Sequence, residues 1–308
     1  MNKRANAKIA MSSFLALEDE PETTTAHLVD IEDAEYHEHD AVSKTKLNEF
    51  LESSLVFFHR YVEGTMPLKK QSKEMAVGSV VHAVLLEGKS LDDLIAVYPD
   101  SVLTSAGAIN SRGAEYKAWA AENEGKYWFK QADVSSVTEC VKAVIDSELA
   151  DLVKSATHRE RSIFWTDTET GLECRCKPDF FCELPDRVIG YDLKISPMVS
   201  PEAFLRQVKR FRYWLQDAHY STGLSALYGK PVQFRFWVVE PVKPHRIKCY
   251  WLEEINTRTT AFERWSSAMK SLAECFRSGD WSDKWDGKLV LNQWDFGGEV
   301  EEELNWEE

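Results

Sequence analysis

Residues 174–196 read CRCKPDFFCELPDRVIGYDLKIS, and this stretch decides the fold. Its two apolar and aromatic runs, separated by the turn-forming LPDR at 184–187, are typical of two strands. Residues two apart in a strand point to the same face, so the side chains of Asp192 and Lys194 emerge together. If the two strands pair, Asp179 reaches the same place. The stretch therefore predicts a cluster of two acids and one base on a sheet.

Such a cluster suits metal-assisted chemistry at a phosphate. Asp179 and Asp192 would offer oxygen ligands to one divalent cation, as Mg²⁺ prefers. Lys194 would orient the attacking water or stabilise charge at the phosphate. The alternative is a surface Asp–Lys pair beside a Pro-Asp turn, because exposed charge pairs are common and contribute little. The spacing alone leaves both interpretations open.

The periodicity of the rest of the chain predicts an α/β domain. The order of elements is helices, three strands, a helix, two strands and a helix, which predicts a mixed central sheet flanked by helices. Residues 99–113 are expected to form an exposed loop. The expected helices are 43–55, 75–87, 114–122, 134–147, 201–228 and 259–278, and the expected strands are 162–168, 172–182, 188–195, 232–240 and 246–252.

The net charge of −14 is concentrated at the two ends of the chain. Residues 1–40 carry a net charge of −7 and residues 280–308 carry −8, which leaves +1 for the remainder. A neutral core can still present a basic groove to nucleic acid. We expect an acidic, disordered tail over 1–38, one folded domain over 39–290 and an acidic C-terminal tail over 291–308.

The composition also limits the compartment and the cofactors. The chain has no apolar run long enough to span a membrane and no clear signal-peptide cleavage site, so we expect a cytoplasmic protein. Its six cysteines form no CxxC pair. Cys174, Cys176 and Cys182 fit small core residues better than a metal or iron–sulfur site.

The predicted helix after the strands carries a second group of functional candidates. Gln216 and Tyr220 are four residues apart and share one face. Four basic residues precede them and could neutralise DNA phosphates. The alternative for such a helix is a solvated surface. The four basic residues are Arg206, Lys209, Arg210 and Arg212.

These segments together resemble a known family. Residues 174–196, followed by FRYWLQDAHYSTGLSALYG at 211–229, resemble the nuclease core of RecE-type exonucleases (exodeoxyribonuclease VIII). That family belongs to the PD-(D/E)XK superfamily, together with lambda exonuclease. VSKTKLNEFLESSLVFFHRY at 42–61 and AVGSVVHAVLLEG at 76–88 resemble its entry helix and its G-x-x-x-H helix. The resemblance runs from about residue 36 to 285, in family order, and implies a restriction-endonuclease-like core.

The resemblance also implies roles for individual residues. His82 matches the metal-binding histidine, although a lone histidine on an apolar helix stripe is otherwise a core residue. Asp179 and Asp192 match the metal carboxylates, and the Leu193 carbonyl completes that set. Lys194 matches the catalytic lysine. Gln216 and Tyr220 match the Q-x-x-x-Y pair beside the end of the substrate.

The activity implied is a Mg²⁺-dependent exonuclease, with Mn²⁺ as a substitute, that degrades one strand of linear double-stranded DNA. The direction expected from the resemblance is 5′ to 3′, and the single strand produced would serve recombination. A single-strand annealing protein, a ring-shaped homo-oligomer and a phage or bacterial setting are expected on the same basis. With no Walker A loop in the sequence, cleavage should be independent of ATP. The rivals are a repair or restriction endonuclease of the same fold and a non-catalytic DNA-binding or DNA-mimic protein.

Overall fold

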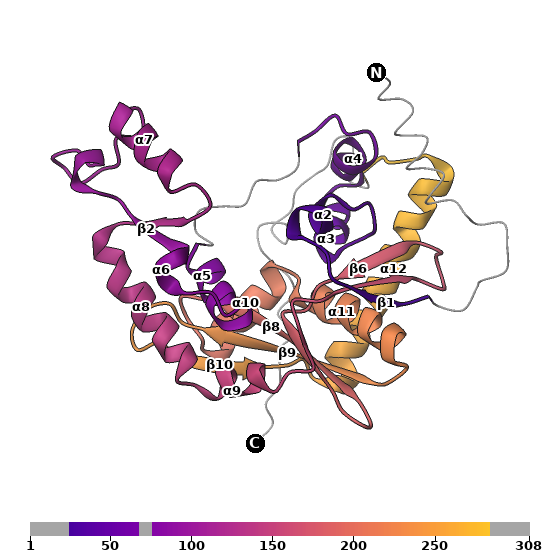
Figure 1. Cartoon of the computed structure of the whole chain (residues 1–308). Helices are drawn as coiled ribbons and strands as arrows, with labels where there is room; N and C mark the ends of the chain where they lie inside the picture. The colour runs from indigo at the N-terminus through magenta and orange to yellow at the C-terminus, as the bar shows by residue number, and fades with distance from the viewer. Residues whose placement is uncertain (1–24, 68–75, 284–308) are drawn as a thin grey trace, which may run out of the picture.

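The computed structural model describes residues 25–67 and 76–283. A five-stranded mixed sheet lies at its centre, in the order β10-β9-β8-β7-β4. β8 and β9 run parallel, while the other neighbours are antiparallel. The predicted mixed sheet flanked by helices is confirmed (Figure 1). Its strands are β4 (His158–Arg159), β7 (Phe180–Glu183), β8 (Val188–Ile195), β9 (Val232–Val239) and β10 (Ile247–Tyr250).

The two faces of β8 pack against different helices. Ile189, Tyr191 and Leu193 belong to an apolar cluster with α5 (Ala76–Leu86), α8 (Gln131–Ile145) and α9 (Glu148–Lys154). Val188 belongs to the opposite cluster, with α3 (Lys44–Glu52), α11 (Tyr213–Tyr228) and α12 (Thr259–Ser278). Since side chains alternate along a strand, Asp192 lies on the α11 face together with Val188. Figure 1 shows these two helical layers on either side of the sheet.

The predicted helix over 201–228 is wrong in one respect, because it is two helices. α10 (Pro201–Arg210) begins at Ser200, whose side chain accepts a hydrogen bond from Ala203 N, and α11 begins after Arg212. Arg212 has φ 49° and ψ 53°, a left-handed conformation that breaks the helical path. The predicted end of α11 at Gly229 is confirmed, with φ 63° at that residue.

The single strand expected over 172–182 is also two strands, and they lie in different sheets. β6 (Glu173–Cys176) pairs with β5 (Ser162–Thr166), which pairs with β1 (His27–Val29). β7 joins the main sheet. Pro178 lies between them and has no N–H to donate to a ladder, so strand pairing stops there. Asp179 is therefore placed where the chain passes from one sheet to the other.

The N-terminal boundary needs a similar correction. β1 and α2 (Asp33–Glu38) lie inside the tail expected over 1–38. His27 pairs with Phe164 of β5, and their rings stack with centroids 5.9 Å apart. A strand of three residues is too short to produce a period that sequence reading detects. Residues 1–24 and the predicted tail over 291–308 lie outside the described residues.

The remaining elements surround this core. β2 (Ile95–Val97) and β3 (Tyr127–Phe129) form a small parallel pair, and α7 (Ala114–Glu122) extends beyond it (Figure 1). Most of the loop expected over 99–113 is irregular, apart from the short helix η3 (Asp100–Val102). No helix in the described part of the chain is both long and apolar enough to cross a membrane. The others are α4 (Ser54–Phe57), η1 (Phe58–Val62), α6 (Leu91–Leu94) and η4 (Glu254–Arg258).

Two glycines let α11 approach the sheets. A Cβ on Gly190 of β8 would lie 2.7 Å from Leu224 Cδ1 of α11 and 2.7 Å from Phe234 Cδ2. A Cβ on Gly223 of α11 would lie 2.7 Å from the Trp165 ring of β5. These distances are shorter than real contacts allow, so glycine is needed on both surfaces. The distance between α11 and β8 depends on them.

We predict that Gly190→Ala lowers the free energy of unfolding by about 1–3 kcal/mol, because the added methyl group overpacks the core. Chemical denaturation measures this change. Gly113→Ala is the matched control, since its Cβ would meet chiefly the flexible side chain of Asn110. Equal stabilities of the two variants would contradict the close-approach argument.

Candidate active site

Asp179 and Asp192 meet because β7 and β8 pair. Phe180 is the partner of Tyr191 in this antiparallel ladder, so the next position places Asp179 opposite Asp192. Asp179 is 7% exposed, and its Oδ2 accepts a hydrogen bond from the backbone N–H of Leu193 at 2.5 Å. The pairing proposed from the sequence is therefore present, and it buries a carboxylate.

Asp192 and Lys194 form a buried ion pair rather than an exposed one. Lys194 Nζ lies 2.5 Å from Asp192 Oδ2, and Asp192 is 5% exposed. Gln216 of α11 donates from Nε2 to Asp192 Oδ1. Burial lowers the pKa of Lys194, but the charge of Asp192 outweighs it and raises the pKa above its usual value. The charge of Asp192 thus favours the ammonium form of Lys194, and the burial of the pair argues against the surface-pair alternative.

α5 brings His82 to the same point. Its Nε2 lies 3.5 Å from Asp179 Oδ2 and 3.3 Å from the Leu193 carbonyl oxygen. Gly78, one turn earlier, allows this approach, because a Cβ there would lie 3.3 Å from Ile195 of β8. The spacing G-x-x-x-H therefore has a physical reason: the glycine brings the helix close, and the histidine on the same face reaches the carboxylates.

Glu160 is a site residue that sequence reading missed. Its Oε1 lies 3.8 Å from His82 Nδ1, and Lys177 Nζ lies 3.3 Å from its Oε2. Its backbone has φ 49°, an unusual conformation for a residue other than glycine, and its N–H donates to the Asp179 carbonyl oxygen. The segment HRER at 158–161 looks like surface charge in the sequence, which hides this role.

Three of these residues have the donor set of a divalent cation site. Ligand atoms of His82, Glu160 and Asp179 all lie within 4.8 Å of one another. Two carboxylates, one imidazole and the nearby Leu193 carbonyl fit Mg²⁺ or Mn²⁺, which prefer oxygen-rich sites. Asp192 is not part of this triad, and its two oxygens contact Lys194 and Gln216. Its role as a metal ligand remains a prediction.

The titration behaviour shows uncompensated negative charge at the triad. Burial raises the pKa of Asp179 to about 8; the charge of His82 opposes this shift, and Asp192 and Glu160 add to it. Burial lowers the pKa of His82, but Asp179, Glu160 and Asp192 outweigh it and hold the pKa at about 9. The raised pKa values of Asp179 and His82 therefore favour protons at a place where a cation would supply positive charge.

The other predicted site residues lie on α10 and α11. Tyr220 packs edge-on against Phe234, with ring centroids 5.5 Å apart, and burial raises its pKa well above the usual value. Gln216 contacts the site, as described, and the charges of Asp192 and Asp179 add to the raised pKa of Tyr220. Arg212 donates to Asn48 of α3 at 2.9 Å. The remaining basic candidates are exposed on α10: Arg206, Lys209 and Arg210.

Lys44 and Tyr213 are further neighbours that sequence reading missed. Lys194 Nζ lies 4.7 Å from the centre of the Tyr213 ring, and Lys44 Nζ lies 5.8 Å from it. Burial and the charge of Lys194 lower the pKa of Lys44 to about 8. A lysine at the start of a helix, next to its N-cap Ser43, gives no signal of this position in the sequence.

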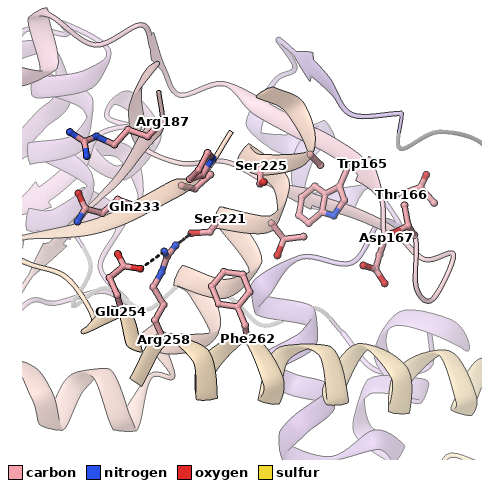
Figure 2. Close-up of a pocket in the computed structure, with 15 residues that line it drawn as sticks. Trp165, Thr166, Asp167, Arg187, Ser221, Ser225, Gln233, Glu254, Arg258 and Phe262 are labelled. Atoms are coloured by element: carbon pink, nitrogen blue, oxygen red, sulfur yellow. Dashed lines mark hydrogen bonds and ion pairs between the residues drawn. The ribbon is translucent and has the colours of Figure 1, made fainter. Parts of the chain in front are cut away.

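A cavity of about 650 Å³ lies away from this site, between α11, η4 and the strand ends (Figure 2). Arg258 crosses it and donates to Ser221 and Glu254. Arg258 also pairs with the fully buried Asp217, which ties η4 to α11. No predicted site residue lines this cavity.

The cysteines behave as core residues. Cys174 and Cys176 are fully buried in the cluster under α11, and burial raises the pKa of both thiols well above the usual value. Cys182 belongs to the cluster on the opposite face of the sheet. The predicted structural role of this trio is consistent with these positions.

Comparisons with known proteins agree with this geometry. Residues 43–287 match the model of a family described as a PDDEXK-like domain of unknown function (DUF3799). Among solved structures, the chain is similar to a "putative exonuclease" from Eubacterium rectale, with a TM-score of 0.54 and 15% identity. That match covers 88% of this chain and 100% of the other. No curated protein matches the chain. The predicted restriction-endonuclease-like fold is thereby confirmed.

We predict that a divalent cation stabilises the protein through Asp179. Thermal unfolding with and without Mn²⁺ should show a rise in Tm, since a ligand at a hundredfold excess over its Kd contributes about 2.7 kcal/mol. Asp179→Asn should abolish the shift with Mn²⁺, because a neutral amide replaces the carboxylate ligand. A normal Mn²⁺ shift in this variant would contradict the assignment.

We also predict that the site binds metal more tightly as pH rises from about 6 to 9. The pKa of Asp179 is raised by burial, and the pKa of His82 is raised chiefly by the charge of Asp179, so a cation that binds there competes with protons. Titration with Mn²⁺ at several pH values measures this dependence. His82→Ala and Glu160→Gln should each weaken binding, and His82→Ala should also flatten the pH dependence. A core histidine would instead change stability and leave metal binding as it is.

Proposed function

This chain belongs to the PDDEXK-like domain family, within the PD-(D/E)XK nuclease superfamily, and from that premise we propose that it is a Mg²⁺-dependent deoxyribonuclease. One observation carries the proposal. Asp179, Asp192 and Lys194 converge with His82 at one point of the sheet: Asp179 directly precedes β7, Asp192 and Lys194 lie on β8, and His82 lies on α5. Maintaining buried carboxylates beside each other costs stability, and hydrolysis at a phosphate gives that arrangement a purpose.

The residues can divide the reaction among them. His82, Glu160 and Asp179 would hold the cation, with Asp192 and the Leu193 carbonyl beside them. A bound divalent ion lowers the pKa of water and stabilises charge on the phosphate. Lys194, charged and fixed by Asp192, orients the water and stabilises the oxygens of the phosphate. Gln216 fixes the other oxygen of Asp192, so the carboxylate cannot turn away.

We further propose that the enzyme is an exonuclease of the RecE type. The support is the resemblance of residues 36–285 to that family and the description of the similar Eubacterium rectale protein as a "putative exonuclease". On this proposal it acts on the ends of double-stranded DNA, 5′ to 3′, without ATP. A single-strand annealing protein and a ring-shaped homo-oligomer belong to the same proposal, as does a cytoplasmic setting in a bacterium or phage-infected cell.

A repair or restriction endonuclease of the same fold is the second candidate, since the site chemistry is common to both. The choice depends on whether an end is needed. An exonuclease leaves closed circular DNA intact, whereas an endonuclease cuts it. A non-catalytic DNA-binding role is less well supported, because the buried Lys194–Asp192 pair would then have no chemical use.

We predict that Asp179→Ala, Asp192→Ala and Lys194→Ala each reduce the cleavage rate by about 10²-fold or more, because each removes a group that acts on charge developing at the phosphate. End-labelled linear duplex, digested with Mg²⁺, with Mn²⁺ and with EDTA, measures the rate. Closed circular DNA in parallel separates exonuclease from endonuclease.

Asp186→Ala serves as the matched control, since Asp186 is an exposed carboxylate in the turn between β7 and β8. It should cleave at the rate of the unaltered protein. If any of the three site variants keeps that rate, the residue concerned has no catalytic role.

A further inference from the structure

An exposed aromatic side chain stands at the corner between α10 and α11, beside the candidate active site. Phe211 is 43% exposed, although Tyr213, two residues on, packs against a buried apolar cluster. Its neighbour Tyr213 is half-buried and stacks on Phe236 of β9, with ring centroids 5.5 Å apart. A single exposed apolar side chain is common in folded proteins, so the significance of Phe211 depends on its position beside the site.

The corner is fixed rather than loose. Arg212 adopts the left-handed conformation at φ 49°, which costs about 1–3 kcal/mol for a residue other than glycine. Two contacts to α3 hold it: Lys44 Nζ donates to the Phe211 carbonyl oxygen at 2.9 Å, and Arg212 Nη1 donates to Asn48 Oδ1 at 2.9 Å. The backbone at Phe211 is therefore held in place while its ring stays exposed.

A chain of rings connects Phe211 to the catalytic lysine. The Phe211 and Tyr213 rings are stacked, with centroids 5.8 Å apart and an interplanar angle of 28°. Lys194 Nζ lies 4.7 Å from the centre of the same Tyr213 ring. Each nucleotide of a strand advances about 3.4 Å. A base on Phe211 would thus belong to a nucleotide within a few steps of the phosphate that Lys194 contacts.

Positive charge surrounds the exposed ring. The Arg210 guanidinium lies over the ring, 5.2 Å from its centre, where a stacked base would take its place. Lys44 donates to the Phe211 carbonyl oxygen. Arg206, one turn earlier on α10, is exposed on the same surface. An aromatic platform among cations is the arrangement by which proteins hold single-stranded nucleic acid, because phosphates need the cations and bases need the ring.

We propose that Phe211 stacks on an unpaired base of the DNA strand close to the scissile phosphate. Arg210 and Lys44 contact the phosphates on either side of that base. The inference rests on the proposed nuclease function and adds to it a substrate-positioning residue. It also implies that the strand is unpaired for at least one nucleotide at the site, so that a base is available to stack.

A cycle of paired changes in protein and DNA tests the proposal. Binding of a labelled duplex is measured by fluorescence anisotropy in Ca²⁺, with a gel to verify that the DNA stays intact. An abasic residue is placed in turn at each terminal position of either strand. Phe211→Ala should weaken binding to intact DNA about tenfold, which is ~1.4 kcal/mol and lies within the ~1–3 kcal/mol of base–aromatic stacking. When the abasic residue replaces the base that stacks on Phe211, Phe211→Ala and the unaltered protein should bind the DNA equally well.

Matched variants separate stacking from other effects. Phe211→Trp should bind as well as the unaltered protein, whereas Phe211→Leu should resemble Phe211→Ala. Ile255→Ala removes another exposed apolar side chain, on η4, and should change nothing. The Tm of Phe211→Ala should match that of the unaltered protein. If the Tm of Phe211→Ala is lower, normal DNA binding by Phe211→Trp still shows that an aromatic ring is what binding requires.

Three results would overturn the inference: an unchanged affinity of Phe211→Ala, an equal loss at every abasic position, or full binding by Phe211→Leu. If the unaltered protein cleaves DNA and one of these results appears, the stacking role alone is wrong. If the unaltered protein neither binds nor cleaves DNA, the proposed function falls with it.

Discussion

The close approach of α11 to β8 is the constraint on which the site depends. Gly190 and Gly223 remove the side chains that would separate the helix from the strands. Because the helix lies this near, Gln216 reaches Asp192, and Asp192 in turn fixes Lys194. On the opposite face of the sheet, Gly78 allows α5 to lie close to β8, so that His82 reaches Asp179. Small residues on both faces therefore determine where the reactive groups stand.

Backbone strain is found at two ends of the same site. Glu160 and Arg212 are both left-handed residues other than glycine, and both are held by contacts to site elements. Glu160 turns its carboxylate toward His82, while Arg212 exposes Phe211. The third such residue, His245, belongs to the turn between β9 and β10. Strain that persists in a fold needs surrounding structure to hold it, and such positions concentrate at functional sites.

Sequence reading was accurate where periodicity is long and local. β8 and α12 have the bounds expected from their patterns, because eight and twenty residues give a clear period. It failed where one residue redirects the chain. Arg212 divides a helix that has no glycine or proline at that point, and Glu160 sits in a run that resembles surface charge. Lys44 and Lys194 are far apart in the sequence but close in space, and no local sequence pattern predicts such a contact.

The buried charges give the strongest reason to regard this arrangement as functional. A buried ion pair is often no more stabilising than well-packed apolar residues of similar volume, so stability alone does not explain Lys194 and Asp192. Burial raises the pKa of Asp179, and the charges of Asp192 and Glu160 raise it further, so the fold keeps an ionised carboxylate there at a cost in stability. A fold that is locally consistent elsewhere accepts these penalties at one point of its sheet. The buried charges and the strained residues lie close together, and such a coincidence indicates that chemistry rather than packing explains which residues are found there.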